Sequence, residues 1–296
     1  MSNGIPVLTL DAVAILSRVL VALGPLVIVP IGLDLGRPAS PSQGSVDRVT
    51  RQARRLVLPP ALAFAAALTL PAGALAAALA VPWMLMTALV GALGIARFWT
   101  REPGRRFDVS ELAIDLGFAY LPVGGAWAFV HRSDLGVLGF AGTSALLTCA
   151  HFHFAGFGLC VLVGALGLRL GTARDGVDRA ATLVAASSVA LLALGITMSR
   201  TLEIIAAWSL VLGVVLVARM SWRASRCEED LPRRLSRLSA FAGCFAAAFA
   251  AHYATIGFAR LDGTTFRRMM LCHALVNALG FVGAGLLARR LVTTRT

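Results

Sequence analysis

The stretch "AATLVAASSVALLALGITM", residues 180–198, decides the fold class. It contains no charged side chain, and its length is close to the roughly 20 apolar residues that an α-helix needs to cross the hydrocarbon of a bilayer. The rest of the chain has the same character, because 58% of its residues are hydrophobic and 14% are charged, against about 45–50% and about 25% in soluble domains. The alternating pattern of a membrane β-barrel is absent. The sequence therefore predicts an all-α, polytopic transmembrane helical bundle.

About nine apolar stretches qualify as spans, and they predict a single integral membrane domain, residues 1–296. The second and third stretches meet near Pro82 with almost no loop, so eight spans with one broken helix is the alternative. The nine are Val7 to Leu33, Leu56 to Ala80, Val81 to Phe98, Ser110 to Val130, Val137 to Leu168, Arg179 to Met198, Leu202 to Ala218, Leu238 to Gly257 and Phe266 to Leu287.

The net charge of +12 comes from arginine alone, since the chain contains no lysine. The arginines lie in short loops between apolar stretches, which is the pattern of topology signals, so we expect no nucleic-acid partner. If the basic loop from Arg37 to Arg55 is cytoplasmic, successive spans that cross the membrane in opposite directions place few arginines outside. The sequence thus predicts an outer N-terminus and a cytoplasmic C-terminus. The outer arginines would be Arg132, Arg200, Arg260, Arg267 and Arg268.

The segment "CAHFHFAGFG", residues 149–158, places two histidines near mid-membrane in the fifth span. Polar groups at that depth are costly and normally face the bundle interior. His151 and His153 point about 200° apart on a helix, and His151 shares its side with Thr148 and several small residues. We therefore expect His151 to be functional and His153 to be structural, making an interhelical hydrogen bond. The alternative is that both are satisfied core histidines.

Other polar residues converge at the same outer depth. His273 and Asn277 are spaced i and i+4 in the last span, and Glu203 begins the seventh. The predicted catalytic residues are His151, His273, Glu203 and Asn277, and the predicted substrate-binding residues are Thr148, Met270, Phe281, His252 and Tyr253. Two alternatives stay open, because the His273–Asn277 pair could simply bridge two helices, and Glu203 could be explained by the helix dipole or by pairing with Arg200.

A secondary polar site is predicted at the cytoplasmic start of the fourth span. Asp108 at the N-cap and Glu111 three residues later fit a variant of the capping box. Asp115 lies about 6 Å deeper and has no such explanation. We expect Asp115 to pair with Arg18 or Arg97, or to begin a polar path together with Glu111.

Two histidine motifs carry a resemblance to a known family. The pattern His-Phe-His-aromatic-Ala-Gly-Phe at residues 151–157, followed by His273-x-x-x-Asn277-Ala-x-Gly-Phe, resembles the bacterial membrane proteins called YndJ-like. The resemblance covers roughly the C-terminal two-thirds of the chain. This sequence has Phe154 where the family often has Tyr, and Ala274 where it often has Gly. The resemblance implies a polytopic helical fold in a bacterial inner or plasma membrane and carries over no activity.

The residues themselves favour an intramembrane enzyme. Histidines and a carboxylic acid in an apolar pocket suit general acid–base chemistry on a lipophilic substrate, such as cyclisation or isomerisation of an isoprenoid or polyketide. The alternatives are a transporter of protons, ions or small molecules, a metal or haem protein, and a noncatalytic scaffold or immunity protein. No cofactor or metal motif occurs, so we expect neither. The expected partners are the substrate and membrane lipids, and the oligomeric state stays open.

Overall fold

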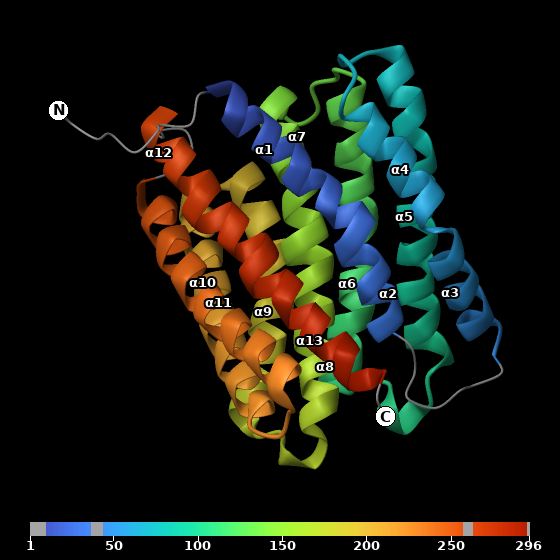
Figure 1. The fold of residues 1–296 in the computed structure, drawn as a ribbon, viewed down its shortest axis with the longest axis vertical. Helices are drawn as coiled ribbons and strands as arrows, with labels where there is room; N and C mark the ends of the chain where they lie inside the picture. The colour runs from blue at the N-terminus through green and yellow to red at the C-terminus, as the bar shows by residue number, and fades with distance from the viewer. Residues whose placement is uncertain (1–9, 37–43, 257–262, 295–296) are drawn as a thin grey trace.

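The structure is a computed structural model that describes residues 10–36, 44–256 and 263–294. The described residues form helices and no β-strand, and eight helical segments are long and apolar enough to cross a membrane. This confirms the all-α polytopic bundle. The longer helices are α1 (Leu10–Leu23), α3 (Ser45–Leu56), α4 (Leu58–Ala67), α5 (Ala74–Thr100), α6 (Val109–Arg132), α7 (Gly142–His151), α8 (Cys160–Leu170), α9 (Gly176–Met198), α10 (Arg200–Ser225), α11 (Asp230–Ile256) and α13 (Ala284–Thr293), and the shorter ones include α2 (Val29–Leu35) and α12 (Gly263–Arg268) (Figure 1).

Three of the passages along the bundle contain a π-helical segment, which has a wider turn than an α-helix. These segments are η1 (Gly24–Ile28), between α1 and α2, η3 (Phe152–Leu159), between α7 and α8, and η6 (Met269–Gly283), which precedes α13. In η1, Pro25 follows Gly24, and a proline has no N–H to donate to the α-helical ladder. Single π-helical turns are uncommon and occur frequently at functional sites.

The boundary that the sequence predicts near Pro82 is wrong. The helix α4 has only 10 residues, the chain turns over residues 68–73, and α5 continues through Pro82 to Thr100. Gly73 in this turn has a φ of 147°, a backbone conformation that residues with a Cβ rarely adopt. Pro82 is tolerated because the surrounding helices of a bundle can accommodate the lost hydrogen bond.

The helices α3 and α4 together make one broken passage from end to end of the bundle, beside α5 (Figure 1). Neither helix is long enough to cross a membrane by itself, since α3 has 12 residues and α4 has 10, and so the described residues contain eight helical segments of sufficient length and hydropathy rather than nine. The described chain begins with α1 at one end and finishes with α13 at the other (Figure 1). Which end faces the cytoplasm stays a prediction.

The passage formed by α7, η3 and α8 is the most buried of the spans, and α6 packs against it on one side and against α5 on the other. Glycines let the helix backbones approach closely. A Cβ at Gly94 would lie 2.7 Å from the carbonyl oxygen of Asp115, and one at Gly164 would lie 2.5 Å from that of Ser110. Small residues at such contacts are typical of helix packing in membranes.

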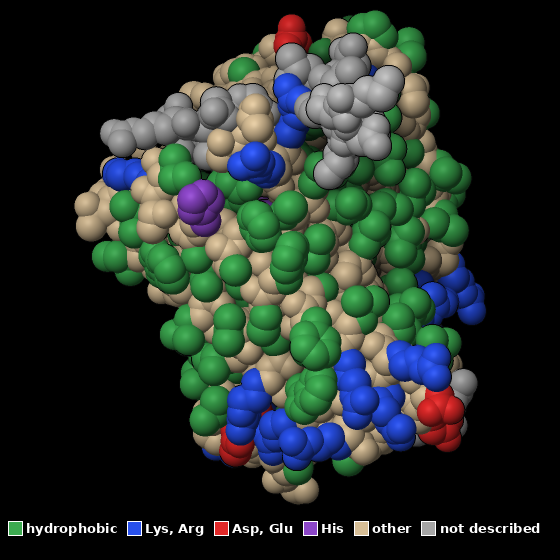
Figure 2. All heavy atoms as spheres, turned by 60° about the vertical axis from the view of Figure 1, so that its left-hand side comes forward, with side chains coloured by type: hydrophobic (Ala, Val, Ile, Leu, Met, Phe, Trp, Pro, Cys, Tyr) green, Lys and Arg blue, Asp and Glu red, His purple; other side chains and the backbone are tan. Residues whose placement is uncertain are grey.

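One end of the bundle gathers most of the arginines. We call it the arginine-rich end, where α2, α5 and α13 finish (Figures 1 and 2). Many of its carboxylates are ion-paired, and the pairs connect helices that are distant in sequence. They are Asp34 with Arg54 and Arg290, Asp108 with Arg174, Glu111 and Asp115 with Arg97 and Arg101, Asp175 and Asp178 with Arg219 and Arg223, and Glu228 with Arg289.

Candidate functional site

Two of the π-helical segments, η1 and η6, pack against the third, η3, and we call this place the π-helical crossing. A Cβ at Gly24 of η1 would lie 2.9 Å from the Cβ of His153. On η3, a Cβ at Gly158 would lie 2.6 Å from Val282 Cγ1 of η6 and 3.1 Å from Ile28 Cγ2 of η1. Glycines therefore allow these three segments to pack together around the histidines.

His153 is completely buried and has its hydrogen bonds satisfied. The indole Nε1 of Trp83 donates to His153 Nε2 over 3.0 Å, and His153 Nδ1 lies 2.8 Å from the carbonyl oxygen of Cys149. An indole N–H can only donate, so Nε2 is the acceptor and Nδ1 carries the proton that Cys149 accepts. The imidazole is thus neutral and holds α5 against η3, an interhelical hydrogen bond of the expected kind.

His151 has the opposite surroundings, although it precedes His153 by only two residues. Its Nε2 is buried and has no hydrogen-bond partner among the described residues. Its ring lies edge-on to Phe152, with 5.9 Å between centroids, and the segment η3, which begins at the next residue, packs against the η6 segment that carries His273. A buried polar atom without a partner costs about 1–3 kcal/mol, which calls for an explanation other than packing.

His273 approaches from η6. Its Nδ1 lies 3.0 Å from the carbonyl oxygen of Ala246 on α11. Because a carbonyl can only accept, Nδ1 carries the proton and Nε2 of the neutral ring carries the lone pair. Asn277 follows four residues later and makes no hydrogen bond with the residues that the structure describes. The two histidines thus belong to passages that pack against each other through η3 and η6, and the hydrogen bond of His273 Nδ1 leaves its Nε2 lone pair facing away from Ala246.

Glu203 is not part of this pair. Its carboxylate lies 2.7 Å from Arg200, and Arg200 also donates to the carbonyl oxygen of Ala254 over 2.8 Å. Ala254 lies about 12 Å beyond Ala246 along α11. Consistent with this separation, the described residues contain no group of three or more His, Cys, Asp or Glu side chains that could hold a metal ion.

The five residues expected to bind a substrate have different surroundings. The Thr148 hydroxyl donates to the carbonyl of Ser144 over 2.9 Å. Met270 and Phe281 are core residues with exposed fractions of 2% and 0%. Tyr253 is buried, whereas its neighbour His252 is exposed. Their role in substrate binding stays a prediction.

The carboxylates of the secondary polar site are held by arginines. Asp115 lies 2.9 Å from Arg97 and 2.5 Å from Arg101, and Glu111 lies 2.9 Å from Arg97. Arg97 also donates to the carbonyl oxygen of Gly36. Of the two partners expected for Asp115, Arg97 is therefore the one that the structure shows. The network fastens α5 to α6 and to the end of α2.

Asp108 caps α6 as predicted, but the second half of the capping box is wrong. Its carboxylate accepts from the backbone N–H groups of Ser110, at 2.9 Å, and Glu111, at 3.2 Å, whereas the Glu111 side chain turns to Arg97. Partial burial by itself raises the pKa of Asp108. Hydrogen bonds from Arg174 and from the two backbone groups outweigh burial and hold this pKa below its ordinary value.

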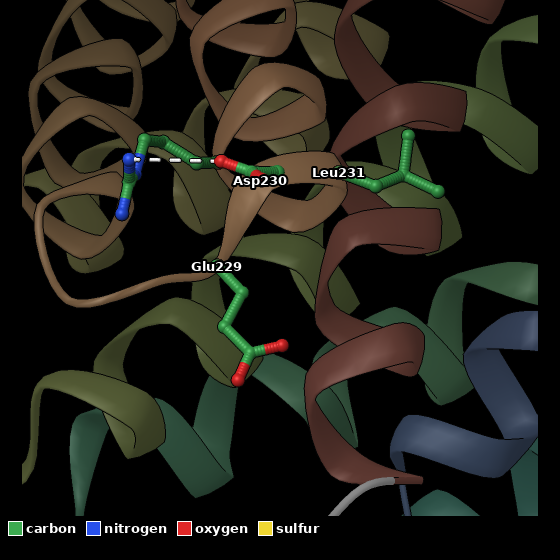
Figure 3. Close-up of a pocket in the computed structure, with 4 residues that line it drawn as sticks. Glu229, Asp230 and Leu231 are labelled. Carbon is green, nitrogen blue, oxygen red and sulfur yellow. Dashed lines mark ion pairs between the residues drawn. The ribbon is translucent and has the colours of Figure 1, made fainter.

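A separate surface depression lies at the arginine-rich end, at the start of α11. Figure 3 shows its lining residues, Glu229, Asp230, Leu231 and Arg233, with Arg233 at 4.0 Å from Asp230. Ala246, which contacts His273, lies about 24 Å from Asp230 along the same helix. The depression is therefore remote from the histidine pair.

The sequence analysis did not identify three residues that shape the crossing. Trp83 supplies the donor for His153, Gly24 leaves room on one side of the ring, and Gly124 leaves room on the other, where a Cβ would lie 2.8 Å from Nδ1. A tryptophan in the middle of a span is the signal that could have revealed the first, because its indole N–H needs an acceptor there. Glycines within spans are a weaker signal for the other two.

Comparisons with known proteins place the chain among bacterial membrane proteins. A family model described as "YndJ-like protein" matches residues 19–281. The protein named "Uncharacterized membrane protein YndJ" from Bacillus subtilis (strain 168) is 29% identical over 209 residues, which make up 71% of this chain and 37% of that protein. The chain thus matches little more than a third of this relative's length. No solved structure matches it.

Proposed function

The chain belongs to the YndJ-like family, and we propose that it is an intramembrane enzyme in which His151 and His273 form a general acid–base pair acting on a lipophilic substrate. One observation supports this most strongly. The buried Nε2 of His151 has no partner among the described residues, and the adjoining segment η3 packs against η6, in which His273 has its Nδ1 engaged with the Ala246 carbonyl. A buried polar atom without a partner is costly for stability, so a bound substrate is a reasonable partner for it.

The pair suits reactions in which a proton is removed at one position and returned at another. His273 would accept a substrate proton at Nε2, and the protonated form of His151 would donate one from its own ring, so that the two rings exchange roles over the reaction. Isomerisation and cyclisation of isoprenoid or polyketide-type molecules need such transfers and no net change of redox state. Asn277 would orient a substrate oxygen beside the pair.

The surroundings of the pair favour a lipophilic substrate. Apolar residues that are only partly buried flank both histidines, namely Leu147 and Ala150 before His151, and Ala274 and Leu275 after His273. Such side chains suit contact with a hydrocarbon ligand, and a substrate dissolved in the bilayer could reach the pair from the side. The reacting groups would be positioned by packing and shielded from water, which strengthens electrostatic interactions.

Proton-coupled transport has less support from the geometry. The two carboxylates that favoured it, Asp115 and Glu203, are ion-paired with arginines at 2.5 Å and 2.7 Å. A carboxylate whose oxygens are held by guanidinium groups is engaged in positioning helices and is not an open binding group for a transported ion. For this reason we place transport behind catalysis.

The test is complementation of a gene deletion in the native host, read by untargeted mass spectrometry of lipophilic extracts. We expect wild-type protein to convert one or more lipophilic compounds, and His151→Ala and His273→Ala to reduce that conversion about 10²–10⁴-fold at normal expression. The matched control is His131→Ala, which removes a histidine that is assigned to no site and whose Nδ1 lies 3.0 Å from the carbonyl oxygen of Gly142. A wild-type profile in both histidine variants would refute the proposal.

A further inference from the structure

The helices α3 and α4 present one continuous exposed stripe, which we call the α3 stripe. It consists of Arg48, Arg51, Arg55, Leu58 and Leu62, with spacings of three and four residues that keep them on one face. The opposite face is buried and includes Ala53, Val57, Ala61 and Phe64. The broken passage is therefore fixed on the bundle by one side and open to its surroundings by the other.

Along the α3 stripe, the chemistry changes from charged to apolar within one turn. Its first half carries three exposed arginines. Its second half carries leucines that are 48% and 59% exposed, and Leu56 beside them is 60% exposed. Exposed leucines next to exposed arginines mark the level at which hydrocarbon gives way to headgroups. The bilayer surface at the arginine-rich end thus lies close to Arg55.

The three arginines of the α3 stripe lie within the phospholipid headgroup layer or at its outer surface. Arg51 lies about 6 Å from Arg55 along the helix and Arg48 about 10 Å, and the headgroup layer on each side of the hydrocarbon is about 5–8 Å thick, so Arg55 and Arg51 lie within that layer and Arg48 lies at its outer surface. The acids of this region do not face the stripe. Asp47 is buried, and Asp34 accepts from Arg54 over 2.7 Å.

From this geometry we infer that Arg48, Arg51 and Arg55 form a binding site for the phosphate groups of anionic phospholipids, with Leu58 and Leu62 contacting the first part of the acyl chains. Guanidinium groups bind phosphate oxygens through paired hydrogen bonds, and clustered basic residues beside a membrane span attract anionic lipids. The site would anchor α3 at the surface, and through Arg54 and Asp34 it would fix the ends of α2 and α13.

The test uses the full-length protein, purified and stripped of lipid in detergent, and native mass spectrometry of added dioleoylphosphatidylglycerol. We expect the phosphatidylglycerol to bind more tightly than dioleoylphosphatidylcholine. The double variant Arg48→Gln, Arg51→Gln should weaken this binding roughly twenty-five-fold, at about fivefold for each arginine. If the double variant does not fold, the single variant Arg51→Gln tests the site, and it should weaken phosphatidylglycerol binding about fivefold.

The matched control removes two exposed arginines elsewhere at the arginine-rich end, Arg226→Gln and Arg234→Gln. It should leave phosphatidylglycerol binding within about twofold of wild type. Equal weakening in the two double variants would show a general effect of positive charge and overturn the site. Complete loss of bound phosphatidylglycerol on addition of inorganic phosphate would assign the arginines to a free anion and would also overturn the lipid site. Equal affinity for phosphatidylglycerol and phosphatidylcholine would overturn it as well.

Discussion

The arginine-rich end and the π-helical crossing use polar residues in opposite ways. At the arginine-rich end, the buried carboxylates are paired with guanidinium groups, as in the network of Arg97 with Glu111 and Asp115, although Arg174 Nε and Arg289 Nη1 there have no partner among the described residues. At the crossing, the Nε2 of His151 is buried without a partner in the described part of the chain, and no charged group there is paired with its ring. An ion-paired network contributes to the position of helices, whereas an unpartnered polar group costs stability. Both arginines keep ion pairs through their other nitrogens. The difference teaches that an unpartnered atom points to a functional site only where the rest of its side chain has no evident structural role.

His153 refines this comparison within the crossing itself. It lies in the same segment as His151 and is more deeply buried, yet Trp83 and the Cys149 carbonyl satisfy both of its ring nitrogens. One histidine of the motif thus has all its hydrogen bonds satisfied, and the other does not. Separate measurements of stability and activity in variants of each should distinguish their roles.

The largest effect on stability is expected from breaking the ion-paired network. Replacing Arg97 by Leu leaves Glu111 and Asp115 buried with fewer partners, and we expect it to lower the free energy of unfolding by about 3–5 kcal/mol. Thermal unfolding in detergent and the yield of folded protein measure this. The control is Arg105→Gln, because Arg105 is 56% exposed and lies 3.6 Å from Glu111, so its loss should cost less than about 1 kcal/mol. Comparable losses in the two variants would contradict the structural role of Arg97.

A smaller loss is expected when the hydrogen bond to His153 is removed. Trp83→Phe keeps an aromatic ring in the core but leaves His153 Nε2 without its donor, which should cost about 1–3 kcal/mol. Activity per folded molecule in the complementation assay should be unchanged. Trp99→Phe is the control, since Trp99 is 64% exposed. Loss of activity in Trp83→Phe without loss of stability would mean that His153 has a functional role and not only a structural one.

Only part of this comparison could be predicted from the sequence. The hydrophobic runs determine the helical bundle, and the facing directions of His151 and His153 follow from helical geometry. The pairing of Asp115 with Arg97 was one of two expected outcomes, because a buried carboxylate needs a cation. The sequence could not reveal that Glu203 lies far from the histidines, since its depth alone does not specify which helices are neighbours.

The π-helical segments and the turn after α4 were also beyond sequence reasoning. A π-helical turn changes which residues share a face, so the assumed spacing of His273, Asn277 and Phe281 was that of an ordinary α-helix. The turn at residues 68–73 depends on Gly73 and Pro71, while the more prominent Pro82 lies inside a continuous helix. Local breaking signals do not show which of two prolines the tertiary packing will accommodate.

A near-zero effect on stability is expected where the hydrogen bonds are incomplete. His151→Leu replaces an unsatisfied polar group by an apolar one, so the free energy of unfolding should stay the same or rise by up to about 1 kcal/mol, while the proposed activity is lost. Thermal unfolding and the complementation assay are measured on the same preparations. His153→Leu is the matched variant and should show the reverse, with stability reduced and activity per folded molecule retained. A clear loss of stability in His151→Leu would mean that its ring has a structural partner after all.

The last prediction concerns the ion pairs at the N-terminus of α9. A hydrogen bond from Arg219 and another from the backbone N–H of Asp178 hold the pKa of Asp175 well below its ordinary value of 3.8. A depressed pKa contributes stability above the unfolded-state value, and this contribution is lost as the pH falls through the lower pKa of the folded protein. Asp175→Asn keeps a good capping residue and removes the charge, so it should lower the melting temperature by a constant amount between about pH 5 and pH 8. The difference in melting temperature should shrink below about pH 4.

The control is Asp134→Asn, because Asp134 is an exposed acid without an ion pair among the described residues. This variant should show neither the lower melting temperature nor its dependence on pH. If the difference for Asp175→Asn persisted undiminished in acid, the charge of Asp175 would not be its cause.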